Sequence, residues 1–289
     1  MKKSLIALAV LATTGAAMAQ SSVTLYGRLD ASVGSLDTGA ASDTRMFSNN
    51  LTTSRWGVMG SEDLGGGLKA NFRLETAIDV TDGTSTGFGR ASWVGLSGGF
   101  GGLTLGKRDS AFKDAFDLGN TYNVFDSEFT AGKASTEGAA AVNVGNFTSR
   151  PNNQIRYDSP KFGGFSGSYS YAFDQTAGTE SDVQAFHLRY AGGPLDVALA
   201  FQRDGESLSS TRSTVSLAGT YQFPGFKLLG TYAKTRDMGA ADSGQRSSWS
   251  LGARVPAFAG EVRVSLRQTH DDQVNGLRDF SKDVDLRHV

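Results

Sequence analysis

The sequence contains no cysteine, five prolines and three histidines in 289 residues. Without cysteine the chain has no disulfide, no thiolate nucleophile and no zinc-thiolate site. The histidines, His187, His270 and His288, lack the spacing of a metal site. The glycine clusters lack the strand-to-helix context of a phosphate-binding loop, and the Asp-rich segments lack EF-hand spacing. We therefore expect neither an enzyme nor a bound cofactor or metal.

The chain also lacks an excess of either charge and any long apolar run beyond its N-terminus. Its 28 basic and 29 acidic residues do not have the balance of a nucleic-acid-binding protein. No later stretch reaches the 18 or more apolar residues of a membrane helix. The mean hydropathy of −0.26 argues against a helical membrane protein. It does not argue against a membrane β-barrel, in which only every second residue meets lipid.

The N-terminal segment has the pattern of a secretory signal peptide. Lys2 and Lys3 form its charged region, residues 5–12 form its apolar run, and Ala17-Met18-Ala19 is a small-x-small cleavage site. We expect cleavage after Ala19, export of the chain, and a single domain over residues 20–289.

Glycine is abundant, with 37 residues, and six glycine- or proline-containing turn signals recur regularly. All intervals between their starts but one are 32 to 35 residues, which hold two strands of about ten residues, a short turn and a longer polar loop. The exceptional interval of 62 residues contains segment 109–150. Short turns on one side and long loops on the other are typical of outer-membrane barrels. The turn signals begin at Glu62, Ser97, Ser159, Ala191, Phe223 and Pro256.

Apolar and polar residues alternate along the segments between these turns, as in 22–31, 68–79 and 261–267. A period of two predicts β-strands. A soluble β-sandwich also alternates, but here the polar face is charged and no segment supplies a second apolar layer. A barrel with an apolar outside and a wet interior needs no such layer. We predict fourteen strands, near 22–33, 53–62, 68–79, 90–97, 102–108, 152–158, 165–173, 182–190, 195–203, 211–221, 226–235, 248–255, 260–269 and 283–289.

Segment 109–150 interrupts this rhythm for about forty residues. A loop of that length within a compact domain is usually either functional or a sign that the strand assignments are wrong, and we favour a functional loop. We interpret it as folded into the interior, and a solvated or adhesive surface loop is the alternative. Its six acidic residues, which outnumber three basic ones, are Asp109, Asp114, Asp117, Asp126, Glu128 and Glu137.

Five segments of the chain together resemble the general porins of Gram-negative bacteria, of the β-proteobacterial type. They are SVTLYG (22–27), SRWG (54–57), GSEDLGGGL (60–68), VGLSG (94–98) and SPKFGGF (159–165). The resemblance implies an all-β, transmembrane antiparallel barrel of sixteen strands in the outer membrane, usually a homotrimer. Its expected partners are outer-membrane lipid and lipopolysaccharide, and small hydrophilic solutes and ions, with no nucleic acid. In that family the third long loop folds into the pore and faces basic residues on the wall.

The sequence departs from the family pattern in two places. Met59 stands where the family usually has a second basic residue on the second strand. The chain also stops at Val289 without the terminal aromatic residue of the family. We expect an incomplete chain that lacks the last two strands, and a genuine fourteen-stranded barrel is the alternative.

The resemblance names the residues that would narrow the pore. The basic candidates on the wall are Arg28, Arg55, Arg73 and Arg90, and the acidic candidates on the loop are Asp109, Asp114, Asp117 and Asp126. Opposed charges across a water-filled opening determine which ions pass. The polar face of the strands carries more basic than acidic residues, which favours a weak preference for anions. The alternative is that each arginine is a solvated charge or is paired with a neighbouring acid. Lys107 and Arg108 cannot both face inward, and the pattern does not choose between them.

Three functions fit this pattern. The first, which we favour, is a diffusion channel for small hydrophilic solutes and ions. The second is a substrate-specific channel in which aromatic residues of segment 109–150 guide sugars or organic acids. The third is a barrel that acts as an adhesin or phage receptor, with a plugged interior.

Overall fold

The computed structural model describes residues 22–37, 42–49, 52–119, 147–174, 181–207, 210–238, 244–257, 260–271 and 277–288. The predicted signal peptide, residues 1–19, and the predicted loop residue Asp126 lie outside these ranges.

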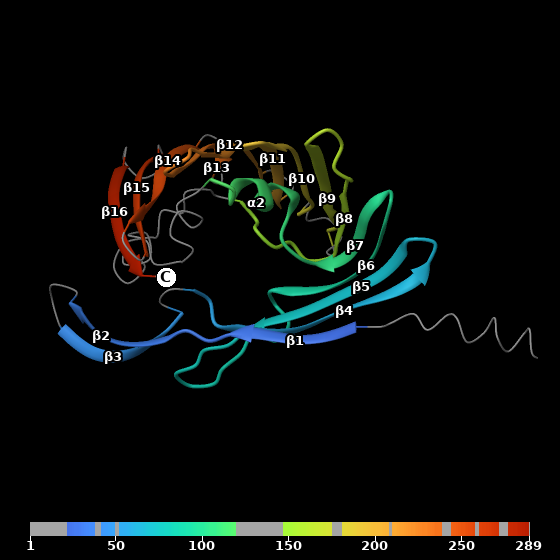
Figure 1. Ribbon diagram of the computed structural model, residues 1–289, viewed down its shortest axis with the longest axis horizontal. Helices are drawn as coiled ribbons and strands as arrows, with labels where there is room; N and C mark the ends of the chain where they lie inside the picture. The colour runs from blue at the N-terminus through green and yellow to red at the C-terminus, as the bar shows by residue number, and fades with distance from the viewer. Residues whose placement is uncertain are drawn as a thin grey trace, which may run out of the picture.

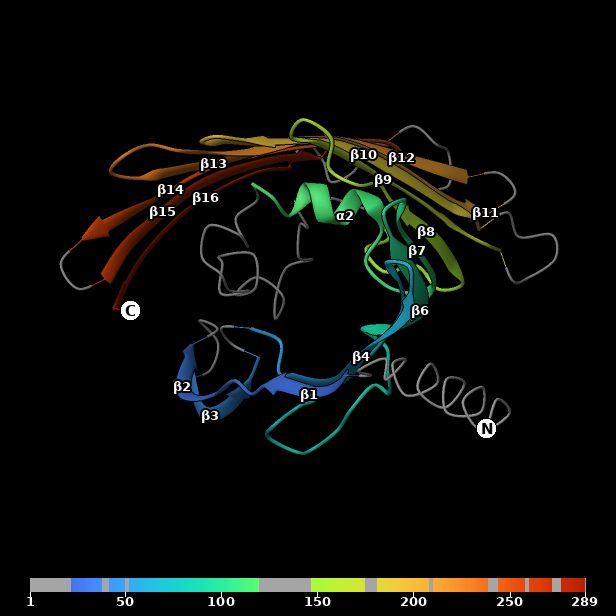
Figure 2. The ribbon, with the colours of Figure 1, turned by 45° about the vertical axis from the view of Figure 1, so that its right-hand side comes forward.

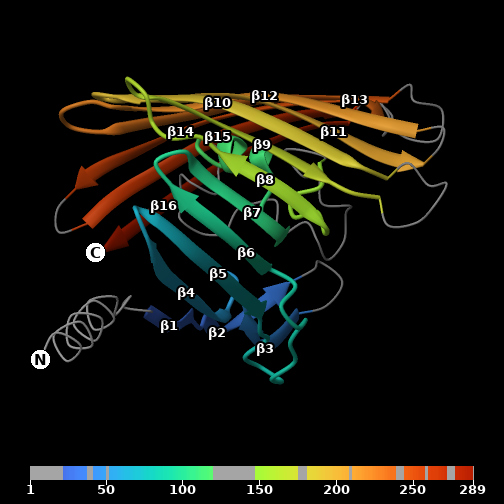
Figure 3. The same cartoon turned by 90° about the vertical axis from the view of Figure 1, so that its right-hand side faces the viewer.

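Fourteen strands form one antiparallel sheet, in the order β1, β4 and then β5 to β16 in sequence. The sheet is strongly curved, so that β10 to β13 face β1 and β4 across helix α2 (Figures 1 and 2). Strands β4 to β13 run side by side (Figure 3). The strands are β1 (Ser22–Arg28), β4 (Arg55–Gly65), β5 (Leu68–Ala77), β6 (Ala91–Gly98), β7 (Gly101–Lys107), β8 (Gln154–Asp158), β9 (Phe165–Ala172), β10 (Val183–Gly192), β11 (Leu195–Ser207), β12 (Ser210–Gln222), β13 (Lys227–Met238), β14 (Gly244–Ala257), β15 (Gly260–Asp271) and β16 (Leu277–His288).

The period-two pattern places large apolar side chains on the convex face of this sheet. Leu188, Leu199 and Leu217 lie in register on β10 to β12 and are each at least half exposed. Their neighbours on the concave face, such as Ala185 and Ser216, are buried. This arrangement is the reverse of a soluble protein and matches a barrel whose outer face meets lipid.

The predicted short turns form where glycine supplies the required backbone. Gly66, Gly163 and Gly193 have φ of +60°, +56° and +54°, a region that side chains with a Cβ rarely adopt. These turns join β4 to β5, β8 to β9, and β10 to β11.

The expected first strand over residues 22–33 is wrong in its second half. Strand β1 ends at Arg28, and β2 (Ala31–Asp37) pairs with β3 (Ser42–Ser48) in a separate two-stranded sheet, within what we predicted to be mostly loop. Asp30 causes the break, because its amide donates to Ser54 Oγ at 2.8 Å and its carboxylate accepts from Thr52 N at 2.6 Å. The chain therefore leaves the β1–β4 ladder at this residue.

One short helix, α2 (Ala111–Phe116), lies on the concave face of the sheet. Among the residues that the structure describes, no helix has the length and apolar character needed to cross a membrane. The two described ends of segment 109–150, residues 109–119 and 147–150, flank the part that is not described.

Candidate functional site

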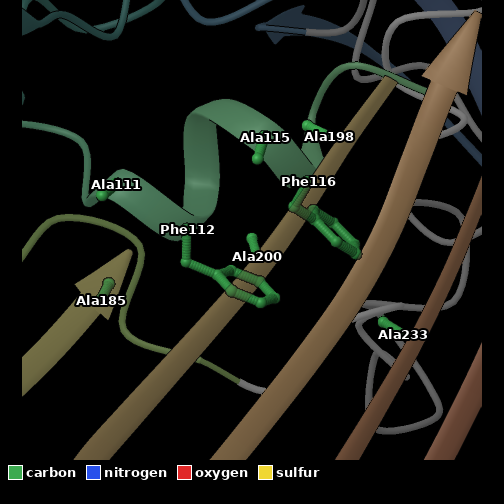
Figure 4. Close-up of a cluster of buried hydrophobic side chains, with 8 residues drawn as sticks. All are labelled: Ala111, Phe112, Ala115, Phe116, Ala185, Ala198, Ala200 and Ala233. Carbon is green, nitrogen blue, oxygen red and sulfur yellow. The ribbon is translucent and has the colours of Figure 1, made fainter. Parts of the chain in front are cut away.

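Helix α2 packs on a patch of small side chains on the concave face. Phe112 and Phe116 are 0 % and 5 % exposed, and both point toward the strands beneath the helix (Figure 4). Phe147 packs against both rings, with centroids 4.6 and 5.2 Å away. Small side chains allow this approach because they leave room for a helix above the sheet. This alanine patch consists of Ala185, Ala198, Ala200 and Ala233.

Hydrogen bonds fix the start of the helix to the same strands. Ser110 Oγ accepts from Lys113 N as the N-cap and donates to Gln202 Oε1 at 2.8 Å. The amide of Ala111 donates to Ser170 Oγ at 3.1 Å, and its carbonyl oxygen lies 2.6 Å from His187 Nδ1. These bonds satisfy polar groups that burial would otherwise leave without a partner.

The returning end of the segment lies beside its start. Ser110 N donates to Ser149 O at 3.0 Å, and Thr148 N donates to Asp204 Oδ1 at 3.1 Å. Gln202 Nε2 donates to Thr148 O at 2.9 Å, so one glutamine on β11 holds both ends.

Across the concave face, three of the four predicted wall arginines converge on Glu75 of β5. Arg90 Nε is 2.7 Å from Glu75 Oε1, and Arg73 Nη2 is 2.5 Å from Glu75 Oε2. Arg55 Nε lies 3.8 Å from Glu75 Oε1. Tyr26 Oη donates to the same carboxylate at 2.9 Å and accepts from Arg73 Nε at 2.7 Å. We call Arg55, Arg73 and Arg90 with Glu75 the arginine cluster.

Two further arginines lie beside the segment. Arg156 of β8 has a side chain that is 3 % exposed and forms ion pairs of 2.6 Å with Asp114 and Asp158. Its Nη1 also donates to Asp109 O at 2.9 Å. Arg108 lies 3.2 Å from Asp158 and stacks over the ring of Trp93 at 5.4 Å.

Arg73, Arg90 and Glu75 of the cluster and the described ends of the segment line one pocket of about 170 Å³. Burial lowers the pKa of the Arg108 guanidinium from its usual value. That value is so high that the group stays charged. Positive groups outnumber negative ones around this pocket. The charged side chains that line it are Arg73, Arg90, Arg108 and Arg150, with Glu75, Asp109 and Asp114.

The other predicted site residues lie apart from this pocket. Arg28 is opposite Arg55 in register, and no described hydrogen bond or ion pair joins it to Glu75. Asp117 forms an ion pair with Lys113, one helical turn before it. Of the undecided pair, Arg108 lines the pocket, whereas Lys107 Nζ donates to Asn152 Oδ1 at 2.6 Å.

Sequence analysis missed Glu75 and Arg156 as members of the site. Alternation does place Glu75 on the same face as Arg73, so the pair could have been found two residues apart on one strand. Nothing in the sequence indicates that Arg156 reaches the segment. Among the residues that the structure describes, no group of three or more His, Asp or Glu has the arrangement of a metal site.

Comparisons with known proteins agree with this architecture. A family model described as Gram-negative porin matches residues 4–283. Outer membrane porin protein 32 of Delftia acidovorans is 40 % identical over 91 % of this chain and 79 % of its own. An outer membrane porin protein of Bordetella pertussis is 34 % identical over 82 % of this chain and 70 % of its own.

Among solved structures, an anion-selective porin from Comamonas acidovorans superposes with a TM-score of 0.73 at 26 % identity. That match covers 92 % of this chain and 83 % of the other. The matches confirm the expected family, its β-barrel fold and its outer-membrane location. The chain belongs to the Gram-negative porins, which are channels of the outer membrane and not enzymes.

Proposed function

We propose that this porin is a water-filled channel for small hydrophilic solutes and ions that prefers anions. The narrow part of the channel lies between the arginine cluster and segment 109–150. One observation carries the anion preference. The acids of the segment are neutralised by neighbouring cations, whereas the arginines of the cluster outnumber the carboxylate that they share.

Each described candidate acid of the segment pairs with a cation, and Arg156, which Asp114 shares with Asp158, is joined there by Arg108. Asp109 pairs with Arg150, Asp114 with Arg156, and Asp117 with Lys113. These ion pairs largely neutralise the negative charge of the three carboxylates.

In the arginine cluster, three guanidinium groups share the single carboxylate of Glu75. Two of these groups, Arg73 and Arg90, border the pocket, so two guanidinium groups stand there against one carboxylate. Like and opposite charges that line a narrow aqueous opening determine which ions pass, so this excess attracts anions and repels cations. The similarity to a porin named anion-selective supports the same preference.

The test is the reversal potential of single channels in a planar bilayer under a salt gradient. We expect discrete ohmic steps and a reversal potential with the sign of chloride rather than of potassium. A potassium-signed potential would overturn the anion preference. Saturating block by one solute would favour the substrate-specific channel, and the absence of steps would favour an adhesin or receptor barrel.

Four other expectations remain proposals for this chain: the homotrimer, contacts with lipid and lipopolysaccharide, cleavage after Ala19, and infolding of the whole segment 109–150. Cross-linking in outer-membrane vesicles tests the trimer, and N-terminal sequencing of the exported protein tests the cleavage site.

A further inference from the structure

Three cations stand side by side at one end of the sheet. Lys227 of β13 lies opposite Arg254 of β14 in register, and Arg254 lies opposite Arg263 of β15. Residues directly opposite each other in an antiparallel sheet project from the same face, about 5 Å apart. Like charges at such positions destabilise the pairing of the strands. This row therefore favours negative charge beside it.

The row faces the pore and lies at the turn end of the sheet. Lys227 and Arg263 are two residues along their strands from Leu229 and Ser265, which are buried positions of the concave face. The short turns that join β12 to β13 and β14 to β15 lie directly beyond the row. Lys227 is six residues from Ala233 of the alanine patch, or about 20 Å along the strand. The row is therefore separate from the pocket beside α2.

The acids nearest to the row lie at its far side, around Arg263. Glu261 Oε2 is 2.6 Å from Arg263 Nε, and Asp285 of β16 stands opposite Arg263 in register. In the part of the chain that the structure describes, Lys227 forms no ion pair with an acidic side chain. The positive charge of the row is therefore least compensated at Lys227.

A polar pocket of about 300 Å³ opens beside Lys227. Its other polar side chains are Asp196, Thr220 and Gln222. Asp196 is held by Arg189 through two contacts of 2.7 and 2.5 Å, which neutralise its charge. The groups that remain around the pocket are an ammonium group, a hydroxyl group and a carboxamide, and together they suit an anion.

We propose that Lys227 and this pocket form a second anion-binding site, at the turn-end mouth of the channel. Its ligand is a small inorganic anion or a short carboxylate, which accepts from the Lys227 ammonium group and the Thr220 hydroxyl group. The bound anion also offsets the repulsion between Lys227 and Arg254. The inference rests on the proposed function and deepens it, since two weak sites in series allow an anion both to enter and to leave.

The opposite wall offers a matched comparison at the same end of the sheet. Lys69 of β5 is on the face of Arg73 and stands opposite Asp63 of β4 in register. Opposite charges at such positions attract each other, so this lysine has a compensating acid where Lys227 has a second cation. Lys69→Gln and Lys227→Gln therefore remove the same charge from different surroundings.

The test uses the absence of cysteine from the chain, because one introduced thiol then reports on the pocket alone. Gln222→Cys places this thiol opposite Lys227 in register. Its reaction rates with an anionic and a cationic methanethiosulfonate reagent are measured on refolded full-length channels at low salt. A unit charge about 6 Å away in water changes the local concentration of a monovalent reagent about threefold, in opposite directions for the two reagents. Adding Lys227→Gln should therefore lower the ratio of anionic to cationic rates about tenfold, whereas Lys69→Gln should change it less than about twofold.

Inorganic phosphate at constant ionic strength distinguishes a bound anion from a positive potential alone. Phosphate should slow the anionic reagent in the reporter chain, and this competition should disappear after Lys227→Gln. Three outcomes would overturn the site: an unchanged rate ratio after Lys227→Gln, an equal drop after Lys69→Gln, or no competition by phosphate.

Single-channel steps from the same preparations check folding. A potassium-signed reversal potential would overturn the proposed function and this site with it, whereas a chloride-signed potential with an unresponsive reporter would overturn the site alone. If Gln222→Cys does not fold, Lys227→Gln alone should lower chloride conductance about twofold at low salt and leave it unchanged at about 1 M salt, where the screening length is about 3 Å. Conductance equal to that of the parent at both salt concentrations would count against the site.

Discussion

Two regions of the concave face differ in the size of their inward side chains. On β4, β5 and the approach to β6, the inward positions carry the long side chains Arg55, Arg73 and Arg90. On β10 to β13 the inward positions carry the alanine patch. Both sides belong to one sheet with one alternation, so the difference lies in the residues alone.

This difference determines what covers each side. The alanine patch allows Phe112 and Phe116 to approach the sheet, so the start of segment 109–150 lies on it and excludes water. The arginines are long and charged, so a helix cannot pack on them without costly desolvation, and water remains beside them. The polar cluster and the packed helix therefore face each other across the pocket.

The largest effect is expected from removing the helix anchor. Phe112→Ala should weaken docking of α2 by about 3–5 kcal/mol, the usual cost of deleting a fully buried phenylalanine side chain. If the segment narrows the pore, its release raises single-channel conductance and adds slow current fluctuations. Phe186→Ala is the matched control, because Phe186 is exposed on the convex face and its loss should leave the current unchanged. Parent-like current in Phe112→Ala would show that the helix does not set the channel width.

A smaller effect on the same side is expected from Ser110→Ala. The change removes the N-cap of α2, at a cost of about 1 kcal/mol, and leaves Gln202 Oε1 without the Ser110 donor. Local hydrogen exchange of residues 111–116 should accelerate about fivefold, with little change in the strands. Ser213→Ala on the convex face controls for the loss of a hydroxyl group. Equal exchange in both variants would mean that packing alone holds the helix.

Alternation along the sequence predicted most of the sheet. All fourteen predicted strands correspond to strands of the larger sheet. Apolar and polar residues alternate along a strand wherever one of its faces meets lipid and the other meets water. The β2–β3 hairpin was not predicted, because its separation from β1 depends on contacts of Asp30 with Thr52 and Ser54, which are distant in the sequence.

The site was harder to predict than the sheet. Period two puts Arg73 and Glu75 on one face, but their meeting with Arg55 and Arg90 depends on the register of neighbouring strands. Register is a long-range property of the hydrogen-bonded ladder and cannot be inferred from one strand. The six-residue helix α2 is too short for a helical period, and its stability comes from the alanine patch.

On the arginine side, Glu75→Gln should increase the anion preference. A unit charge about 6 Å from a passing ion in water contributes about 0.7 kcal/mol, which corresponds to about a threefold change in permeability ratio. Removing the shared carboxylate leaves all three guanidinium groups to attract chloride. The reversal potential under a salt gradient measures this ratio. Glu62→Gln makes the same charge change at the exposed turn end of β4 and should shift the potential less.

The smallest effect on chloride preference is expected from Arg28, which lies opposite Arg55 in register on β1 and β4. Arg55→Gln removes one cation from the cluster and should lower the chloride preference about threefold. Arg28→Gln should lower it by less than about twofold, because Arg28 is exposed, does not contact Glu75 and is screened by salt. Raising the salt concentration from 0.1 to 1 M shortens the screening length from about 10 to about 3 Å, so the Arg28 effect should vanish first. Equal shifts from the two variants at both salt concentrations would mean that total charge of the pore, rather than the arginine cluster, sets its selectivity.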